Sequence, residues 1–287
     1  MTVCYQAFCR HHLNWREQAK RMSDSTSPKD QPDGADELPF AAPCRNLKAT
    51  APIGWIKLGW QDLRRAPGAS LSYGAILVVC SYLISFLALS LGNLAVLIAL
   101  LSGFIFLGPI LAMAFYETSV LLQRGEKPTL MNSLGRSLRH LGDQMVFAVI
   151  LMIVFLIWAR AASMIHVFFP ATGHPSLAEM VPFLTVGTVV GSLFAAFVFC
   201  ISAFSLPMIV GRKTDTVTAV VTSFNAVLRN KPAMIVWALL IIAAVAAGFL
   251  TAFIGFAVTL PLIGHATWHA YLETIDSSAR PPPPARR

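Results

Sequence analysis

Long apolar segments separated by short basic links constrain this chain more than any other feature. Segments of roughly 20 apolar residues recur from Ala69 to Glu273, and this is about the length that crosses a bilayer core as a helix. Only 13% of the residues are charged, about half the share found in soluble domains. The pattern predicts an all-α polytopic membrane bundle with spans near 70–91, 94–122, 144–168, 181–210, 233–250 and 252–273.

The basic residues predict how these spans are oriented. The expected links on one side contain every Lys and Arg near the spans except Arg160, while the links on the other side contain none. Because cytoplasmic loops of membrane proteins are enriched in Lys and Arg, we expect a multi-pass protein of the bacterial inner membrane with both termini in the cytoplasm. The net charge of +8 then reflects orientation, and no nucleic acid partner is expected.

Composition divides the chain into three parts. Residues 1–45 are predicted to be a disordered cytoplasmic segment, because Ser23–Glu37 is too polar to form a core. Residues 46–276 form the six-helix transmembrane domain, and 277–287 a disordered tail rich in Pro and Arg. Met22 is an alternative start. The five cysteines are expected to form no structural disulfide in a cytoplasmic or membrane setting.

A unit of basic loop, surface helix and membrane helix occurs three times. Leu63-Arg64, Leu138-Arg139 and Leu228-Arg229 each close an amphipathic segment before an odd-numbered span. The apolar face of these segments is predicted to comprise Ile56, Trp60 and Leu63; Leu130, Leu134, Leu138 and Leu141; and Val217, Val220, Val221, Phe224 and Leu228. Each even-numbered span contains a proline, Pro109, Pro207 or Pro261. These features favour a threefold internal repeat.

The surface segments are expected to contact the membrane surface. Trp55 and Trp60 suit the headgroup region, where an indole buries its ring and still forms a hydrogen bond. We expect anionic lipid headgroups, or a membrane-protein partner, to bind a basic surface made of Arg64, Arg65, Arg136, Arg139 and Arg229. Within the fourth span, Gly187 and Gly191 have the spacing that permits close helix contact, and we assign them to internal packing.

Three polar side chains share one face of the last span. His265, His269 and Glu273 recur every four residues, and Glu117 completes a ligand set if the second and sixth spans are neighbours. A metal or haem site at His265 and His269 is the chemical interpretation. The alternative is a polar belt at the membrane interface, with Trp268 and Tyr271. In the leading interpretation the protein binds no cofactor.

Two further charged residues lie within spans. Glu117 is in the cytoplasmic half of the second span and is expected to pair with Arg124, Arg136 or Arg139. Arg160 lies near the outer end of the third span, where it either extends to the interface or faces a substrate. Buried charges of this kind are costly unless they are paired, so both residues are candidate functional sites.

Several motifs together resemble a known family. They are Leu38–Phe40, Pro43–Arg45, Trp55–Leu63 and Pro261–His269. The chain is similar, over about 38–276, to predicted bacterial integral membrane proteins that form a domain-of-unknown-function family, some of which are labelled cytochrome c oxidase subunit I. The resemblance implies a bacterial inner-membrane protein and no assigned activity. Of the seven histidines, only His166, His265 and His269 lie near spans, too few for a haem–copper centre.

Nothing in the sequence predicts catalysis. There is no Walker loop, Gly-x-Gly-x-x-Gly, His-Glu-x-x-His or Gly-x-Ser-x-Gly motif. The leading interpretation is therefore a non-enzymatic integral membrane protein that helps to assemble, scaffold or support other membrane components. A small transporter or channel is the alternative, and an accessory or haem-binding subunit of a respiratory oxidase is a weaker one.

Overall fold

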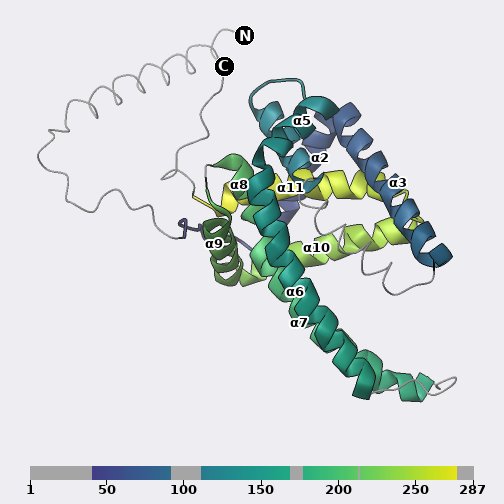
Figure 1. Ribbon diagram of the computed structural model, residues 1–287. Coiled ribbons are helices and arrows are strands. Elements are labelled where there is room, and N and C mark those ends of the chain that lie inside the picture. The colour runs from purple at the N-terminus through teal and green to yellow at the C-terminus, as the bar shows by residue number, and fades with distance from the viewer. Residues whose placement is uncertain (1–40, 92–110, 169–176, 213, 277–287) are drawn as a thin grey trace, which may run out of the picture. The chain divides into compact units, whose positions relative to one another are not determined.

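The described part of the chain is an all-α bundle. The structure is a computed structural model that describes residues 41–91, 111–168, 177–212 and 214–276. Its helices are, in order, α2 (Ala51–Arg65), α3 (Pro67–Leu91), a helical stretch at 111–123, α5 (Leu130–Ser137), η1 (Leu138–His140), α6 (Leu141–Phe168), α7 (Leu177–Ser202), α8 (Ser205–Gly211), α9 (Thr216–Arg229), α10 (Lys231–Leu250) and α11 (Phe256–Thr274). Figure 1 shows their arrangement.

Helix α11 is enclosed by neighbouring helices along much of its length. Its buried residues include Gly264, His265, Ala266, Trp268 and Tyr271. It contacts α2, α3, α8 and α10, and Figure 1 shows α10 and α11 lying side by side. A helix with two histidines, a glutamate and several threonines gains little from facing lipid, so neighbouring helices cover it.

Three glycines permit the close approach of helices around α11. A Cβ atom on Gly59 would lie 2.7 Å from the backbone nitrogen of Ala266, and one on Gly264 would lie 2.7 Å from Cβ of Phe115. A Cβ on Gly74 would overlap the carbonyl of Ala257. Small residues at helix interfaces in membranes let the backbones approach closely, because helices associate there by van der Waals contact.

The surface helices turn their small and hydroxylated side chains inward. In α5 the buried residues are Ser133 and Ser137, while Met131 is 74% exposed. In α9 they include Thr222, Ser223 and Ala226, whereas Val217, Phe224 and Leu228 are exposed. In α2 the buried residues are Pro52, Trp55, Gly59, Asp62 and Leu63. About half of the large apolar side chains of these helices face outward, while others, such as Leu130 and Leu134 of α5, pack partly against buried residues.

Each surface helix packs against an even-numbered predicted span. Helix α2 lies on α11, and α9 lies on α7 and α8. Helix α5 lies on 111–123, where Thr118 Oγ1 donates a hydrogen bond to Ser133 Oγ at 3.0 Å. Capping starts two of these helices: Thr129 and Asp215 accept hydrogen bonds from the backbone N–H groups of Asn132 and Thr218. The threefold repeat itself stays a prediction.

Four described segments are long and apolar enough to cross a membrane. They are Pro67–Leu87, Leu130–Ile165, Val181–Gly211 and Lys231–Leu250, which overlap the first, third, fourth and fifth predicted spans. The second predicted span lies largely outside the described residues. The sixth corresponds to α11, which is a helix but is not among the four, because its polar residues lower its hydropathy. Pro207 lies in α8, after α7 has ended, and Pro261 lies inside α11.

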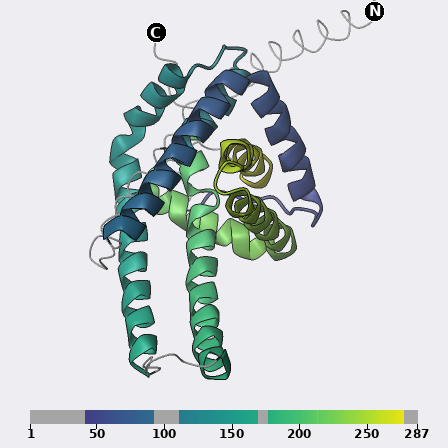
Figure 2. The same cartoon turned by 90° about the vertical axis from the view of Figure 1, so that its right-hand side faces the viewer.

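Helices α6 and α7 form a two-helix arm. They contact each other, and Figure 2 shows them running side by side. No side chain of described residues 155–165 or 181–200 is fully buried. The assignment of Gly187 and Gly191 to internal packing is wrong, because a Cβ atom on either glycine would meet nothing within 4 Å.

The described residues just before α2 contact the end of α11 and the junction of α9 and α10. Cys44 forms an antiparallel bridge with Ile275, and Arg45 N donates to the carbonyl of Thr274 at 2.8 Å. Asn230, between α9 and α10, accepts from Leu47 N at 2.8 Å and donates to the carbonyl of Arg45 at 3.0 Å. These contacts fasten the start of the domain to the end of α11.

A pair of glycine substitutions in α2 tests the close contact with α11. We expect Gly59→Ala to lower stability by about 1–3 kcal/mol, because the added methyl group meets the α11 backbone at less than 3 Å. Gly54→Ala, in the same helix, meets nothing within 4 Å and should be neutral or stabilising. Thermal unfolding in detergent measures both. Equal unfolding temperatures for the two variants would contradict this contact.

Candidate functional site

His265 is the centre of a buried polar cluster. Its Nε2 lies 2.8 Å from Ser70 Oγ of α3, and its Nδ1 lies 2.8 Å from Ser119 Oγ in 111–123. All three residues are fully buried, and the ring of Phe115 packs edge-on against the imidazole. Both ring nitrogens are therefore hydrogen-bonded, as burial of a neutral histidine requires.

Further along the same face of α11, two residues contact α2. His269 Nε2 lies 2.8 Å from Asp62 Oδ2, in a pair whose carboxylate side chain is only 6% exposed. One turn later, Glu273 Oε2 accepts a hydrogen bond from Nε1 of the buried Trp55 at 2.6 Å. The face predicted from His265, His269 and Glu273 is thus used, at each of its positions, to hold a neighbouring helix.

The two histidines of α11 are engaged in hydrogen bonds rather than facing an open space. Three ring nitrogens of His265 and His269 already have hydrogen-bond partners, and a metal would have to displace them. Within the described ranges, no three His, Cys, Asp or Glu side chains converge as a metal site. The full burial of Ser70, Ser119 and His265 also leaves no access for a substrate to a serine hydroxyl. The cluster is built for cohesion between helices.

Glu117 has a different neighbour from those expected. Its carboxylate lies 3.8 Å from His140 Nε2, while Arg136, Arg124 and Arg139 act on its charge from a greater distance. Ser119, two residues later, is the residue that reaches His265. The second and sixth predicted spans are therefore neighbours, as the ligand hypothesis required, but Glu117 does not join the histidines.

The other sequence candidates lie at the surface. Arg160 is exposed on α6, and Arg64, Arg65, Arg139 and Arg229 are exposed on or beside the surface helices. Arg136 is half-buried and forms an ion pair with Glu126 at 3.0 Å. Arg229 donates from Nε to Asn46 Oδ1 at 3.1 Å. No described contact brings Arg160 to the polar residues of α11.

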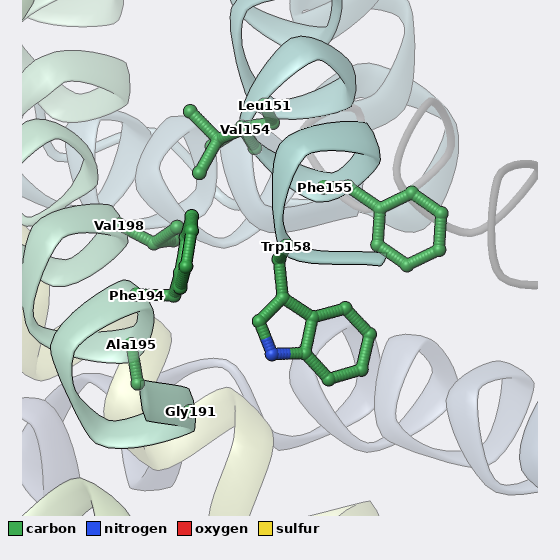
Figure 3. Close-up of a pocket in the computed structure, with 8 residues that line it drawn as sticks. All are labelled: Leu151, Val154, Phe155, Trp158, Gly191, Phe194, Ala195 and Val198. Carbon is green, nitrogen blue, oxygen red and sulfur yellow. The ribbon is translucent and has the colours of Figure 1, made fainter. Parts of the chain in front are cut away.

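An apolar groove lies between α6 and α7. It has a volume of about 420 Å³ and is lined by Leu151, Val154, Phe155, Trp158, Gly191, Phe194, Ala195 and Val198. Figure 3 shows Trp158 and Phe155 on one helix, with Phe194 and Val198 on the other. Its lining contains no charged side chain, so this groove suits an apolar occupant.

A second groove lies on another side of α7. It has a volume of about 540 Å³ and lies between α7, the end of α9 and α10. Its lining is again mostly apolar, with Phe199, Met234 and Ile241 among its residues, and Lys231 is the one charged side chain in that lining. The two grooves share Ala195.

Sequence reasoning missed the partners of α11. Asp62 is 5% exposed, although Arg64 and Arg65 close behind it in the chain are exposed. Trp55 was assigned to the headgroup region but is fully buried against Trp237. A signal was present, because Trp55, Gly59 and Asp62 recur at intervals of four and three on one face of α2. A carboxylate on the same face as a glycine indicates a close polar contact rather than a solvated surface.

Buried Cys44 has a perturbed thiol. Burial raises the pKa of the Cys44 thiol, and the positive charge of Arg229 offsets only part of that shift. Cys44, Cys80 and Cys200 are all free thiols in the described chain. Because the thiolate is the reactive form, Cys44 has little nucleophilic character at neutral pH.

The helices, their apolar surfaces and the buried polar cluster define an integral membrane protein with several apolar helices. A family model described as "Predicted integral membrane protein (DUF2189)", a family of unknown function, matches residues 96–211. This match confirms the resemblance found in the sequence, over a shorter stretch than the expected 38–276. No curated protein and no solved structure matches the chain.

Removing the Asp62 carboxylate tests the polar pairing on α11. We expect Asp62→Ala to cost about 1–3 kcal/mol, because it leaves the part-buried His269 without its hydrogen-bond partner. Gln61→Ala, on the exposed side of the same helix, should change stability by less than about 0.5 kcal/mol. Unfolding in detergent, with His269→Ala and the double variant, gives the coupling energy. Additive effects of the two single variants would show that the pair contributes nothing.

Proposed function

We propose that this protein is a non-enzymatic scaffold of the bacterial inner membrane, and that a transmembrane helix of another membrane protein docks on α7. The observation that carries the proposal is a stripe of small residues on α7, Gly187, Gly191 and Ala195, of which Gly191 and Ala195 line the open groove between α6 and α7. Both glycines have open space where a side chain would begin. Small residues at this spacing allow another helix to approach closely.

The uneven distribution of polar contacts among the helices supports this proposal. Polar contacts around α11 hold α2, α3 and 111–123 together. The described contacts give no such polar support to the arm of α6 and α7 over 155–165 and 181–199, and the exposed residues of the arm include Ile153, Leu184 and Leu193. A bundle with one braced part and one open apolar arm suits a protein that receives another helix.

The same features make a transporter or a respiratory subunit less suitable. Both grooves beside α7 have nearly wholly apolar linings, whereas a path for ions or polar solutes needs polar groups along it. Arg160 is exposed rather than directed into a cavity, and His265 has no ring nitrogen left for a haem iron. We therefore favour the scaffold.

Orientation and lipid contact complete the proposal. Both termini lie in the cytoplasm, as the basic links favour. The exposed Arg64, Arg65, Arg139 and Arg229, together with the half-buried Arg136, then face anionic headgroups. The outward apolar side chains of α2, α5 and α9 enter the interfacial region beside them.

A substitution on α7 tests the docking of a helix. We expect Gly191→Leu to abolish cross-linking from a photoreactive residue at position 187 to a partner protein in native membranes, because the new side chain occupies the open space. The unfolding temperature should not change. Gly54→Leu also points into open space, on α2, and should leave cross-linking intact. A cross-link only to lipid, or an undiminished protein cross-link in Gly191→Leu, would refute a helix docked here.

Reporter fusions test the proposed orientation. A fluorescent protein fused after Lys127 should be fluorescent, while alkaline phosphatase at the same position should be inactive, because the basic link stays in the cytoplasm. The same reporters fused after Ser90, at the opposite end of α3, should give the reverse result. Active phosphatase after Lys127 would show that this link lies in the periplasm and that the proposed topology is inverted.

A further inference from the structure

We propose that the groove between α7 and α10 binds one anionic phospholipid, with one acyl chain in the groove and the phosphate on Lys231. This site shares Ala195 with the helix-docking stripe on α7 but contains neither Gly187 nor Gly191, and the lipid proposal does not depend on the docking of a helix. Three observations support it: the chemistry of the lining, its length, and the position of its one positive charge.

The lining matches a hydrocarbon chain. Ala196 and Phe199 of α7 face Met234, Ala238 and Ile241 of α10 across a volume of about 540 Å³. The α10 residues recur at intervals of three and four, so they form one continuous stripe along that helix. A long, apolar and laterally open space of this kind favours a flexible chain of CH₂ groups over a polar solute.

The length of the groove matches one leaflet. Its α10 lining extends from Lys231 to Ile242, which is about 17 Å at 1.5 Å per residue. Half of a bilayer core is about 15 Å thick. A groove that starts at a helix end and stops near the membrane centre has the dimensions of one lipid acyl chain, and a transmembrane helix would extend beyond it.

The charge at the groove's end selects the headgroup. Lys231 is exposed at the first position of α10, and no described carboxylate is paired with it. Arg229, two residues earlier, is not among the residues that line the groove, so Lys231 is the cation at the groove itself. An ammonium group beside the opening of an apolar groove places charge and hydrocarbon as a phospholipid does, and basic sites between helices commonly bind anionic headgroups.

The test separates the headgroup from the acyl chain. Purified protein is placed in nanodiscs of phosphatidylcholine with about one third phosphatidylglycerol, and the lipids retained after release into detergent are counted by native mass spectrometry. We expect Lys231→Gln to lower retained phosphatidylglycerol about fivefold, the effect of one basic residue near the surface, with phosphatidylcholine unchanged. Lys231→Arg should preserve binding. Lys57→Gln, an exposed lysine on α2, should have no effect.

A second variant tests the groove itself. Ala238→Phe fills the space beside Ile241 and should lower retention of both lipids, whereas Leu239→Phe, at a position that is 59% exposed, should not. Unfolding temperatures show that each variant is folded. The site is overturned if Lys231→Gln retains as much phosphatidylglycerol as the parent protein, or if Ala238→Phe has no effect. If Lys231→Gln lowers retained phosphatidylglycerol but Gly191→Leu leaves the protein cross-link unchanged, only the docked helix is refuted. If Gly191→Leu abolishes the cross-link but Lys231→Gln retains the lipid, only the lipid site is refuted.

Discussion

The contact of α2 with α11 is the interaction on which the rest of the described bundle depends. Helix α11 contains His265, His269 and Glu273, whose exposure to lipid would cost several kcal/mol for each unsatisfied group. Gly59 brings the two backbones together, and Asp62 and Trp55 then reach the polar face of α11. Helices α3 and 111–123 complete the cover through Ser70 and Ser119. The positions of these helices follow from the polarity of a single one.

The surface helices also bury polar side chains, although their opposite faces are apolar. In water, an amphipathic helix buries its large apolar side chains, but lipid provides no hydrophobic gain for doing so. Helices α5 and α9 accordingly bury Ser133, Ser137, Thr222 and Ser223. The hydroxyl of Ser223 both accepts from Phe204 N and donates to the carbonyl of Cys200, where α7 ends and α8 begins. Small hydroxylated residues thus satisfy the backbone at a helix break beside Pro207.

This explains which parts of the structure could be predicted from the sequence. Hydropathy placed the described spans because length and apolarity are local properties, and the spacing of His265, His269 and Glu273 placed them on one face. The partners of that face could not be found, because contacts such as that of Ser119 with His265 join residues far apart in the chain. The sequence pattern marks the large apolar stripe of α5 and α9, but it does not mark the small hydroxylated residues on which these helices pack. In a membrane that stripe can equally face lipid.

The location of the polar residues also decides where binding takes place. The polar contacts described for His265, His269 and Glu273 of α11 all hold a neighbouring helix. The two grooves beside α7 are apolar, and each lies between α7 and a neighbouring helix. An apolar surface in lipid does not distinguish one apolar partner from another. Selective binding to such a groove therefore requires small residues that allow a helix to approach, or a charge at one end of the groove. The first groove contains Gly191 and the second contains Lys231. The two sides of α7 therefore differ in the kind of partner they can distinguish, although their linings are otherwise alike.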